Sequence, residues 1–319
     1  VSGAYFGDKM SPLSDMTNIC ALGAGSRLYD HIRHMLYTAV PSVVVAIIVA
    51  IVAGATLQDG QAPDEMPPSA TLLLDELDTI FHLNLFVLLP VLVVVGGIVR
   101  GLSPALTMAA SSVVAMGLGV VMHGFDAEGA LVAALGGFDL TLLPAHLEAD
   151  PWSPALATLL ERGGLLSMTS TLLLIIAAFL LAGAMEVSGS LETLVRTMLR
   201  RASSIFGLVA ATLASGMVMI GLTSHGGVTA LVVGGLFQDA YRERGLAPVN
   251  LSRTLEDSVT IVEPLMPWTV SAVFMATALG VPTLDYLPWA TFCVTGPIFT
   301  LAYAALQKWT TFGIRRLDP

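Results

Sequence analysis

The sequence predicts an all-α, polytopic membrane protein with broken transmembrane helices, and three observations support this prediction. The chain of 319 residues is 55% hydrophobic and only 12% charged, whereas soluble domains carry about 25% charged residues. Several apolar runs reach the length of about 20 residues that a helix needs to cross the bilayer. Acids and bases fall in separate loops, so the net charge of −10 does not describe a solvated acidic surface. We expect no nucleic-acid partner, because the chain has no basic patch.

Loop charge orients the first half of the chain. Arg27 and Arg33 precede the first apolar run and favour the cytoplasm, so that run is expected to point outward. In chain order we expect an outward span at 35–57, an acidic outer loop at 58–69, an amphipathic surface helix at 70–82, an inward span at 83–99, an outward span at 102–122 and an acidic outer loop with surface helices at 124–163.

The second half of the chain alternates in the same way but contains two unusual segments. Residues 226–238 are short and glycine-rich, and residues 251–279 are interrupted by Pro264 and Pro267. In chain order we expect an inward span at 164–186, an inner-surface helix at 191–201, an outward span at 203–224, a short or partly re-entrant segment at 226–238, a broken stretch at 251–279 and a final span at 287–306.

The distribution of basic residues supports this topology. Each loop is placed on one side of the membrane from its neighbouring residues alone, so the total number of basic residues on each side is an independent check. Of the 14 Lys and Arg residues, 12 fall on the inner side. These are Arg27, Arg33, Arg100, Arg196, Arg200, Arg201, Arg242, Arg244, Arg253, Lys308, Arg315 and Arg316. Arg162 falls outside, and Lys9 lies in a segment that carries several ionisable residues.

Two stretches, residues 3–18 and 251–268, place charged groups where the pattern expects lipid or protein interior. A charge at the bilayer centre costs about 2.5 to 3.5 kcal/mol on the mildest insertion scale, so function is the better explanation. Both stretches carry acids and hydroxyls just before a Pro-Leu pair. Proline breaks a helix and frees carbonyl oxygens.

Freed carbonyls, hydroxyls and carboxylates are ligands that Na+ accepts. A desolvated carboxylate also binds a proton more readily, so one site can serve two competing cations. The positions of the two broken segments, near opposite ends of the chain, are typical of paired elements in a transporter built from repeats.

Structural roles compete with this interpretation. Asp8 and Lys9 can form a buried ion pair that orders the first stretch. Asp15, Thr17 and Asn18 can cap a helix that begins near residue 19, a role compatible with ion binding.

In the second stretch, Glu256 and Asp257 are adjacent and diverge by about 100° on a helix, so both cannot face one ion. We favour Asp257 as the ion ligand, with Glu256 as a partner of Arg253 or a second proton site. Glu263 is expected near a water-filled cavity.

Other motifs indicate structure rather than chemistry. The sequence Ser-His-Gly-Gly at 224–227 is expected to form a polar turn between helices, because no hydrolase elbow accompanies it. The glycine pairs at 96–97 and 234–235 are expected to allow close helix packing. Cys20 and Cys293 form no CxxC metal pair, and no HExxH motif is present, so the sequence does not favour intramembrane proteolysis. We expect a protein that is not an enzyme and has no resident cofactor.

Two motifs resemble a known family. Residues 3–18, GAYFGDKMSPLSDMTN, resemble the signature of NhaC-type Na+/H+ antiporters of the ion-transporter superfamily, and residues 250–268, NLSRTLEDSVTIVEPLMPW, resemble a second block of that family. Weaker similarity occurs at 31–37, 160–168 and 239–248. Family members are longer at the N-terminus, and this chain begins Val-Ser-Gly. The expectation is therefore a single transporter domain over residues 1–319 that lacks its first helices.

The resemblance implies that Na+ is exchanged for H+ across a bacterial inner membrane, with membrane lipid as the surroundings and homo-oligomer formation left open. The implied ion-binding and proton-coupling residues are Asp8, Ser11, Ser14, Asp15, Thr17, Asn18, Thr254, Glu256, Asp257, Ser258 and Thr260. Asp8, Asp15 and Asp257 are the expected ligands of the transported Na+, and Lys9 is a candidate charge partner. The chain departs from the family pattern at Val259, Glu263, Thr269 and His225-Gly226.

The leading hypothesis is an antiporter in which Na+ and H+ compete for these carboxylates. One alternative is a carrier of organic anions of the malate and lactate type, which needs a cationic or dipolar site such as Lys9 or a half-helix N-terminus near Ser14 or Pro267. The other alternative is a receptor or assembly protein that keeps the scaffold without transport.

Overall fold

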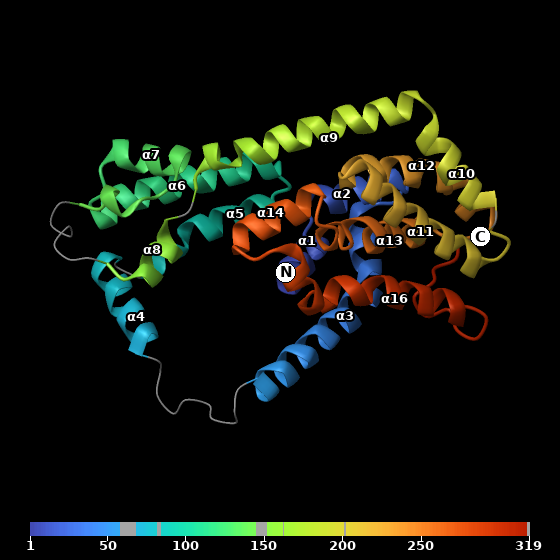
Figure 1. Cartoon of the computed structure of the whole chain (residues 1–319), viewed down its shortest axis with the longest axis horizontal. Coiled ribbons are helices and arrows are strands. Elements are labelled where there is room, and N and C mark those ends of the chain that lie inside the picture. Colours follow the sequence, from blue (N-terminus) through green and yellow to red (C-terminus); the bar gives the residue numbers. More distant parts are fainter. Residues whose placement is uncertain (58–67, 82–83, 145–151, 162, 201, 318–319) are drawn as a thin grey trace. The chain divides into compact units, whose positions relative to one another are not determined.

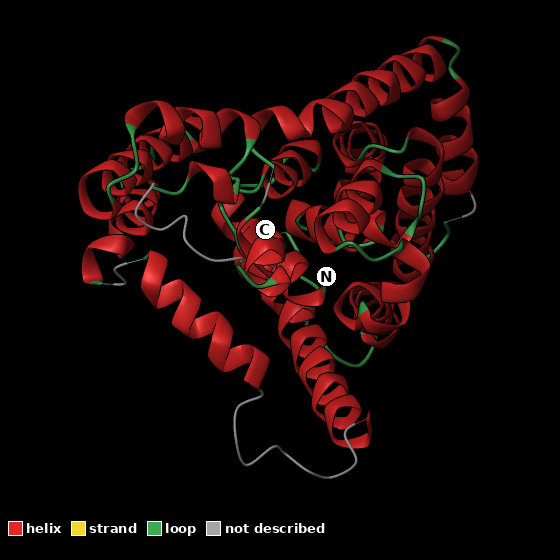
Figure 2. Ribbon diagram, turned by 60° about the vertical axis from the view of Figure 1, so that its left-hand side comes forward, coloured by secondary structure: helices red, strands yellow, loops and turns green. Residues whose placement is uncertain are grey.

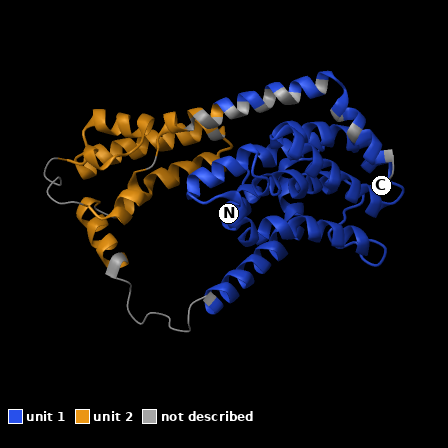
Figure 3. Ribbon diagram, in the orientation of Figure 1, with its two compact units in different colours: residues 1–57, 173–319 blue, residues 58–172 orange. Residues whose placement is uncertain are grey.

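The computed structural model describes residues 1–57, 68–81, 84–144, 152–161, 163–200 and 202–317. Throughout these residues the regular elements are helices, accompanied by two isolated β-bridges (Figures 1 and 2). The chain divides into two compact units (Figure 3). Unit 1 comprises Val1–Leu57 and Leu173–Pro319, and unit 2 comprises Gln58–Leu172. The helical class agrees with the sequence prediction.

Unit 1 begins with two short helices and one long one. Helix α1 covers Ser2–Met10, α2 covers Asp15–Gly23 and α3 covers Leu28–Leu57. The break between α1 and α2 contains Pro12, as the first motif predicts. The capping alternative is wrong, because Ser14 is the N-cap of α2 and its side chain accepts a hydrogen bond from the Thr17 backbone N–H.

The rest of unit 1 forms a bundle around α11 and α12. Its elements are the C-terminal part of α9 (Thr169–Val187), α10 (Ser190–Arg200), α11 (Ile205–Thr223), α12 (Gly226–Glu243), α13 (Pro248–Leu255), α14 (Val270–Leu279), α15 (Thr283–Tyr286) and α16 (Thr291–Leu306). Residues 226–238, which the sequence predicts to be a short or partly re-entrant segment, belong to a helix of 18 residues. The helix is longer than predicted because Ala240 and Tyr241 extend its buried face beyond the glycine-rich part. Ser224, with φ of 59°, makes the predicted turn before it.

The predicted break in residues 251–279 is confirmed. Helix α13 passes into a π-helical turn, Glu256–Thr260, and then into a short 3-10 turn, Glu263–Leu265. The chain bends by 49° before α14. Pro264 and Pro267 account for the break, because neither can donate a helical hydrogen bond.

Unit 2 contains shorter helices that match the predicted order. They are α4 (Pro68–Ile80), α5 (Leu89–Val99), α6 (Pro104–His123), α7 (Ala127–Gly136) and α8 (Pro154–Leu160), with 3-10 turns at Leu85–Leu88, Leu140–Leu142 and Leu165–Met168. Ile80, Leu143 and Leu156 form its small buried cluster. Most of the predicted loop at 58–69, part of the loop at 124–163 and Arg201 lie outside the described residues.

The described part of the chain contains helices suited to a bilayer. Three are long and apolar enough to cross it, at Leu28–Thr56, Ala105–His123 and Ile205–Thr223. The number rises to six if each bent helix pair is counted as one span. This result supports a multi-pass membrane protein with discontinuous helices.

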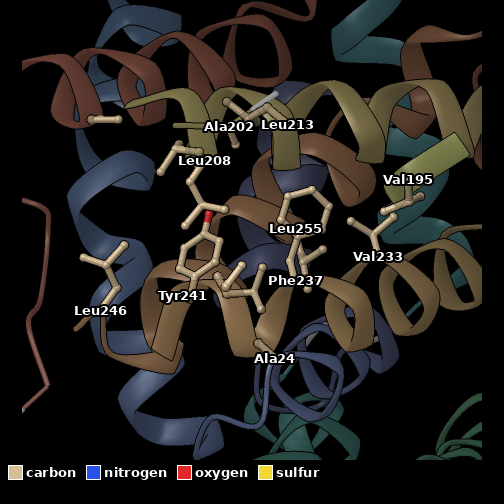
Figure 4. Close-up of a cluster of buried hydrophobic side chains, with 14 of the residues drawn as sticks. Ala24, Val195, Ala202, Leu208, Leu213, Val233, Phe237, Tyr241, Leu246 and Leu255 are labelled. Atoms are coloured by element: carbon tan, nitrogen blue, oxygen red, sulfur yellow. The ribbon is translucent and has the colours of Figure 1, made fainter. Parts of the chain in front are cut away.

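The main apolar cluster of unit 1 holds α11, α12 and α13 together. Leu208, Leu213, Phe237 and Leu255 are buried in it (Figure 4). The Tyr241 hydroxyl lies 3.2 Å from the Thr212 hydroxyl, so the cluster also satisfies its buried polar atoms.

Helices α2 and α12 approach closely at two glycines. A Cβ atom added at Gly234 would lie 2.5 Å from the Gly23 carbonyl oxygen, and one added at Gly23 would lie 2.7 Å from the Ala230 carbonyl oxygen. The neighbouring Gly235 has open space in the same position. Close packing at the predicted glycine pair is thus confirmed for Gly234 and not for Gly235.

We predict that Gly234→Ala destabilises the protein by about 1 to 3 kcal/mol, the usual cost of overpacking, because the new methyl group meets backbone. Gly235→Ala is the matched control and should leave the melting temperature unchanged or slightly higher, since alanine favours a helix. Thermal unfolding of both variants in detergent checks this. Equal melting temperatures would contradict the close approach of α2 to α12.

Candidate functional site

Asp257 is the centre of a buried polar cluster in unit 1. It lies in the π-helical turn and is fully buried. Its Oδ1 atom forms an ion pair with Nζ of Lys9 from α1. Its Oδ2 atom accepts a hydrogen bond of 2.6 Å from the Thr300 hydroxyl of α16. The Lys9 ammonium also donates to the Thr38 hydroxyl of α3 at 3.1 Å.

Three separate helices therefore hold one carboxylate. The predicted Asp8–Lys9 ion pair is wrong, because adjacent residues on a helix point about 100° apart. Lys9 faces Asp257 and is fully buried, whereas Asp8 is half-buried and lines a cavity. Lys9 remains a charge partner, but of Asp257.

The backbone around Asp257 is closely packed. A Cβ atom at Gly296 would lie 3.0 Å from Oδ1 of Asp257 and would collide with the Ile261 side chain. On the other side of the π turn, Gly216 leaves room for the Ser258 side chain. The two glycines let α16 and α11 approach the turn, so the carboxylate is enclosed by protein.

Glu256 points away from Asp257 and meets His31. Both side chains are fully buried, and Oε1 of Glu256 lies 3.6 Å from Nε2 of His31. The predicted pairing of Glu256 with Arg253 is wrong. Arg253 instead contacts Nε2 of His34 at 3.2 Å and donates to the Gly313 carbonyl. A role for Glu256 as a second proton site stays a prediction.

A cavity of about 400 Å³ lies beside the cluster within unit 1. Three carboxylates, those of Asp8, Asp15 and Glu263, line it together with Thr260 and His225, and we call it the acidic cavity. Oε1 of Glu263 accepts a hydrogen bond of 3.4 Å from the Ser271 backbone N–H. The predicted position of Glu263 beside a cavity is confirmed. Asp257 does not line the cavity, but its partner Lys9 directly follows Asp8 in α1.

The remaining polar residues of the first motif shape the helix break. The Thr17 hydroxyl donates to the carbonyls of Asp8 and Lys9 at 3.3 and 3.2 Å. The Asn18 amide donates to the carbonyls of Pro12 and Ser14 at 3.0 and 2.7 Å. Ser11 accepts from the Leu13 backbone N–H, and Ser14 caps α2. Carbonyls freed at the break are thus bound partly by side chains of the same motif.

In the second motif the hydroxyls mostly bond to their own backbone. Thr254 donates to the Asn250 carbonyl at 2.7 Å, and Ser258 donates to the Leu255 carbonyl at 3.2 Å. Thr260 is the member that lines the cavity, and its hydroxyl lies 3.9 Å from the Cys20 sulfur. Both cysteines, Cys20 and Cys293, are free and buried. Over the described residues, no three or more His, Cys, Asp and Glu side chains cluster in a metal-binding group.

Three residues of the cluster were not predicted from the sequence. Thr38 and Thr300 sit in apolar helices, and His31 lies near the start of α3. Pro41 and Pro297 interrupt those same helices close to the two threonines. A threonine close to a proline within a predicted span is the sequence signal that could have identified Thr38 and Thr300.

The fold and this buried charge cluster define a polytopic helical membrane protein with broken helices and a fully buried ion pair. The chain belongs to the Na+/H+ antiporter family, whose model matches residues 3–308. This result confirms the resemblance seen in the two motifs. The family consists of transporters, in agreement with our prediction that the protein is not an enzyme.

Three relatives illustrate the similarity. An uncharacterized Na+/H+ antiporter of Haemophilus influenzae is 39% identical over 305 residues, which cover 96% of this chain and 64% of the relative. The Na+/H+ antiporters NhaC of Alkalihalophilus pseudofirmus and of Bacillus subtilis are 36% and 32% identical, with 96% and 97% of this chain and 63% and 66% of the relatives covered. The chain thus spans just under two thirds of their length. No solved structure matches the chain significantly.

We predict that Thr300→Val lowers the stability of the protein by about 1.5 to 3 kcal/mol, the usual value of a hydrogen bond to a charged group. Thr295→Val on the same helix is the control, since the Thr295 hydroxyl bonds only to α16 carbonyls. Thermal unfolding in detergent compares the two. An equal loss in both variants would show that the Thr300 hydroxyl does not support Asp257.

Proposed function

We propose that the protein exchanges Na+ for H+ across a bacterial inner membrane and that Asp257 is the residue at which the two cations compete. The observation that supports this most is the fully buried Lys9–Asp257 ion pair, which sits between broken helices and next to an acidic cavity. Ionisable groups in a membrane interior are costly and are typically retained for ion pathways. The family membership supports the same activity.

The chemistry of the cluster suits this competition. When Lys9 carries a proton, its ammonium neutralises Asp257 and donates to Thr38. Na+ can take the place of that ammonium, because a carboxylate and two threonine hydroxyls are hard oxygen ligands. Lys9 then loses its proton to water, since two positive charges beside one buried carboxylate repel each other. One site thus holds either the proton or Na+.

The acidic cavity supplies cations to this site. Asp8, Asp15 and Glu263 line it, and carboxylates in a cleft raise the local cation concentration. Thr260, in the same π-helical turn as Asp257, also lines the cavity, so the cavity reaches the segment that carries the coupling carboxylate. In this proposal Asp8 and Asp15 receive Na+ and Asp257 couples it to the proton.

Exchange also requires that the protein changes between inward-facing and outward-facing states only when Asp257 is paired with Na+ or with protonated Lys9. An unpaired carboxylate at Asp257, without Na+ and without protonated Lys9, would be a buried net charge and would resist rearrangement. The breaks at 11–14 and 256–269 are places where the helices can move relative to each other. No resident cofactor is needed in this scheme, because the two cations are the substrates.

An organic-anion carrier is less well supported. It needs a cation or helix N-terminus that is free to bind a carboxylate, yet Lys9 is paired with Asp257. The N-terminus of α2 is capped by Ser14. The Lys9 ammonium and the Thr17 N–H are therefore already occupied by partners within the protein.

We predict that Asp257→Asn abolishes Na+-dependent proton movement in everted membrane vesicles that carry the full protein, because the coupling carboxylate is lost. Asp8→Asn should raise the Na+ concentration needed for half-maximal exchange. The measurement is dequenching of a pH-sensitive dye on addition of Na+. Asp239→Asn is the control, since Asp239 is exposed and remote from the cluster. Full exchange in Asp257→Asn would refute the assignment.

We also predict that Na+ raises the melting temperature of the purified protein, because a ligand that binds the folded state stabilises it. Na+ is expected to compete with one proton. In the pH range where the proton occupies the site, a fall of one pH unit should therefore raise the Na+ concentration needed for the same rise in melting temperature about tenfold. The Na+ effect should disappear in Asp257→Asn. A Na+ effect that is independent of pH would contradict competition at this site.

A further inference from the structure

A second polar cavity, of about 680 Å³, lies in unit 1 between the first turns of α3 and the C-terminal segment. It is distinct from the acidic cavity, because the two share no lining residue. Its lining comprises Asp30, Arg33, His34, Tyr37, Thr311, Gly313, Ile314, Arg315 and Arg316. Three arginines against one aspartate make this cavity basic.

Two exposed arginines of this cavity, Arg33 and Arg316, are available to a ligand. Within the described residues, neither Arg33 nor Arg316 forms an ion pair with a carboxylate. Arg316 donates only long hydrogen bonds, of 3.4 Å to the Arg244 carbonyl and 3.5 Å to the Gln307 amide oxygen. Both side chains are exposed at the mouth of the cavity and can reach a ligand there.

A buried guanidinium stands directly behind the cavity. Arg253 is fully buried and contacts His34 and Gly313, which both line the cavity. Its Nε and Nη2 atoms have no hydrogen-bond partner among the described residues. Leaving buried donors without partners is costly, so these two groups favour a hydrogen-bond acceptor nearby. The described part of the chain pairs no carboxylate with Arg253.

The surroundings place this cavity at a membrane surface. Its arginines are among the basic residues that the charge pattern assigns to the cytoplasmic side. Trp309 and Phe312, next to the lining residues, are 81% and 56% exposed. Exposed aromatic side chains beside basic residues are typical of the lipid headgroup region, where anionic lipids attract arginine.

We propose that this basic cavity, formed by Arg33, Arg315 and Arg316 in front of Arg253, binds a phosphate group. Arginine matches phosphate oxygens in paired hydrogen bonds, so the group can bridge α3 and the C-terminal segment. An anionic phospholipid headgroup and free inorganic phosphate share this chemistry. The bound anion adds negative charge and acceptor oxygens on the side of Arg253 that faces His34 and Gly313. This inference does not depend on the transported ion.

The test measures binding to the full-chain protein, purified and stripped of lipid in a neutral detergent. Short-chain phosphatidylglycerol, short-chain phosphatidylcholine and inorganic phosphate are titrated separately by calorimetry. We expect phosphatidylglycerol or inorganic phosphate to bind, and phosphatidylcholine to bind at least about tenfold more weakly. Arg33→Gln and Arg316→Gln should each weaken that binding about fivefold, the value of one arginine near an anionic surface.

Arg242→Gln is the matched control, because Arg242 is an exposed arginine of the same predicted membrane side that does not line the cavity. Binding of phosphatidylglycerol alone identifies a lipid site, and binding of inorganic phosphate alone identifies a soluble ligand. Binding of neither would overturn the proposal. Equal weakening by Arg242→Gln and Arg33→Gln would also overturn it, since general surface charge would then explain the affinity. Melting temperatures confirm that the variants are folded.

Discussion

The buried Lys9–Asp257 ion pair is the interaction on which the rest of this structure depends. Removing one partner of such a pair typically costs about 3 to 5 kcal/mol, because the other charge stays buried and unpaired. The fold surrounds the pair with hydroxyl groups from separate helices: Thr38 of α3 accepts from Lys9, and Thr300 of α16 donates to Asp257. Helices α1, α3 and α16 and the π turn are thus coupled through one carboxylate, so a cation that replaces the Lys9 ammonium changes contacts in all of them.

The two helix breaks have complementary roles in this arrangement. The break before α2 is held by Thr17 and Asn18 and brings Asp8 and Asp15 to the acidic cavity. The break after α13 begins with a π-helical turn, a feature often found at functional sites, and it directs Asp257 toward Lys9. One break therefore lines the entry cavity for cations, and the other provides the carboxylate that couples them.

Much of the fold was predictable from hydropathy, loop charge and proline positions, because these act locally. The break in residues 251–279 and the order of the helices followed from them. The pairing of Lys9 was not predictable, since Asp257 lies 248 residues away and only tertiary packing selects it over the adjacent Asp8. The same limit applies to Glu256, which meets His31 rather than Arg253. Periodicity assigns a residue to a helix face but does not identify the helix that packs against that face.

Displacement of a proton from the Lys9–Asp257 pair by Na+ is measured by counting the protons released when Na+ binds. Calorimetric titrations of the purified protein with Na+, in buffers of different ionisation enthalpy, give this number. We expect the native protein to release close to one proton for each Na+ bound, and Asp257→Asn to release none. Sodium binding without proton release in the native protein, or undiminished release in Asp257→Asn, would contradict it.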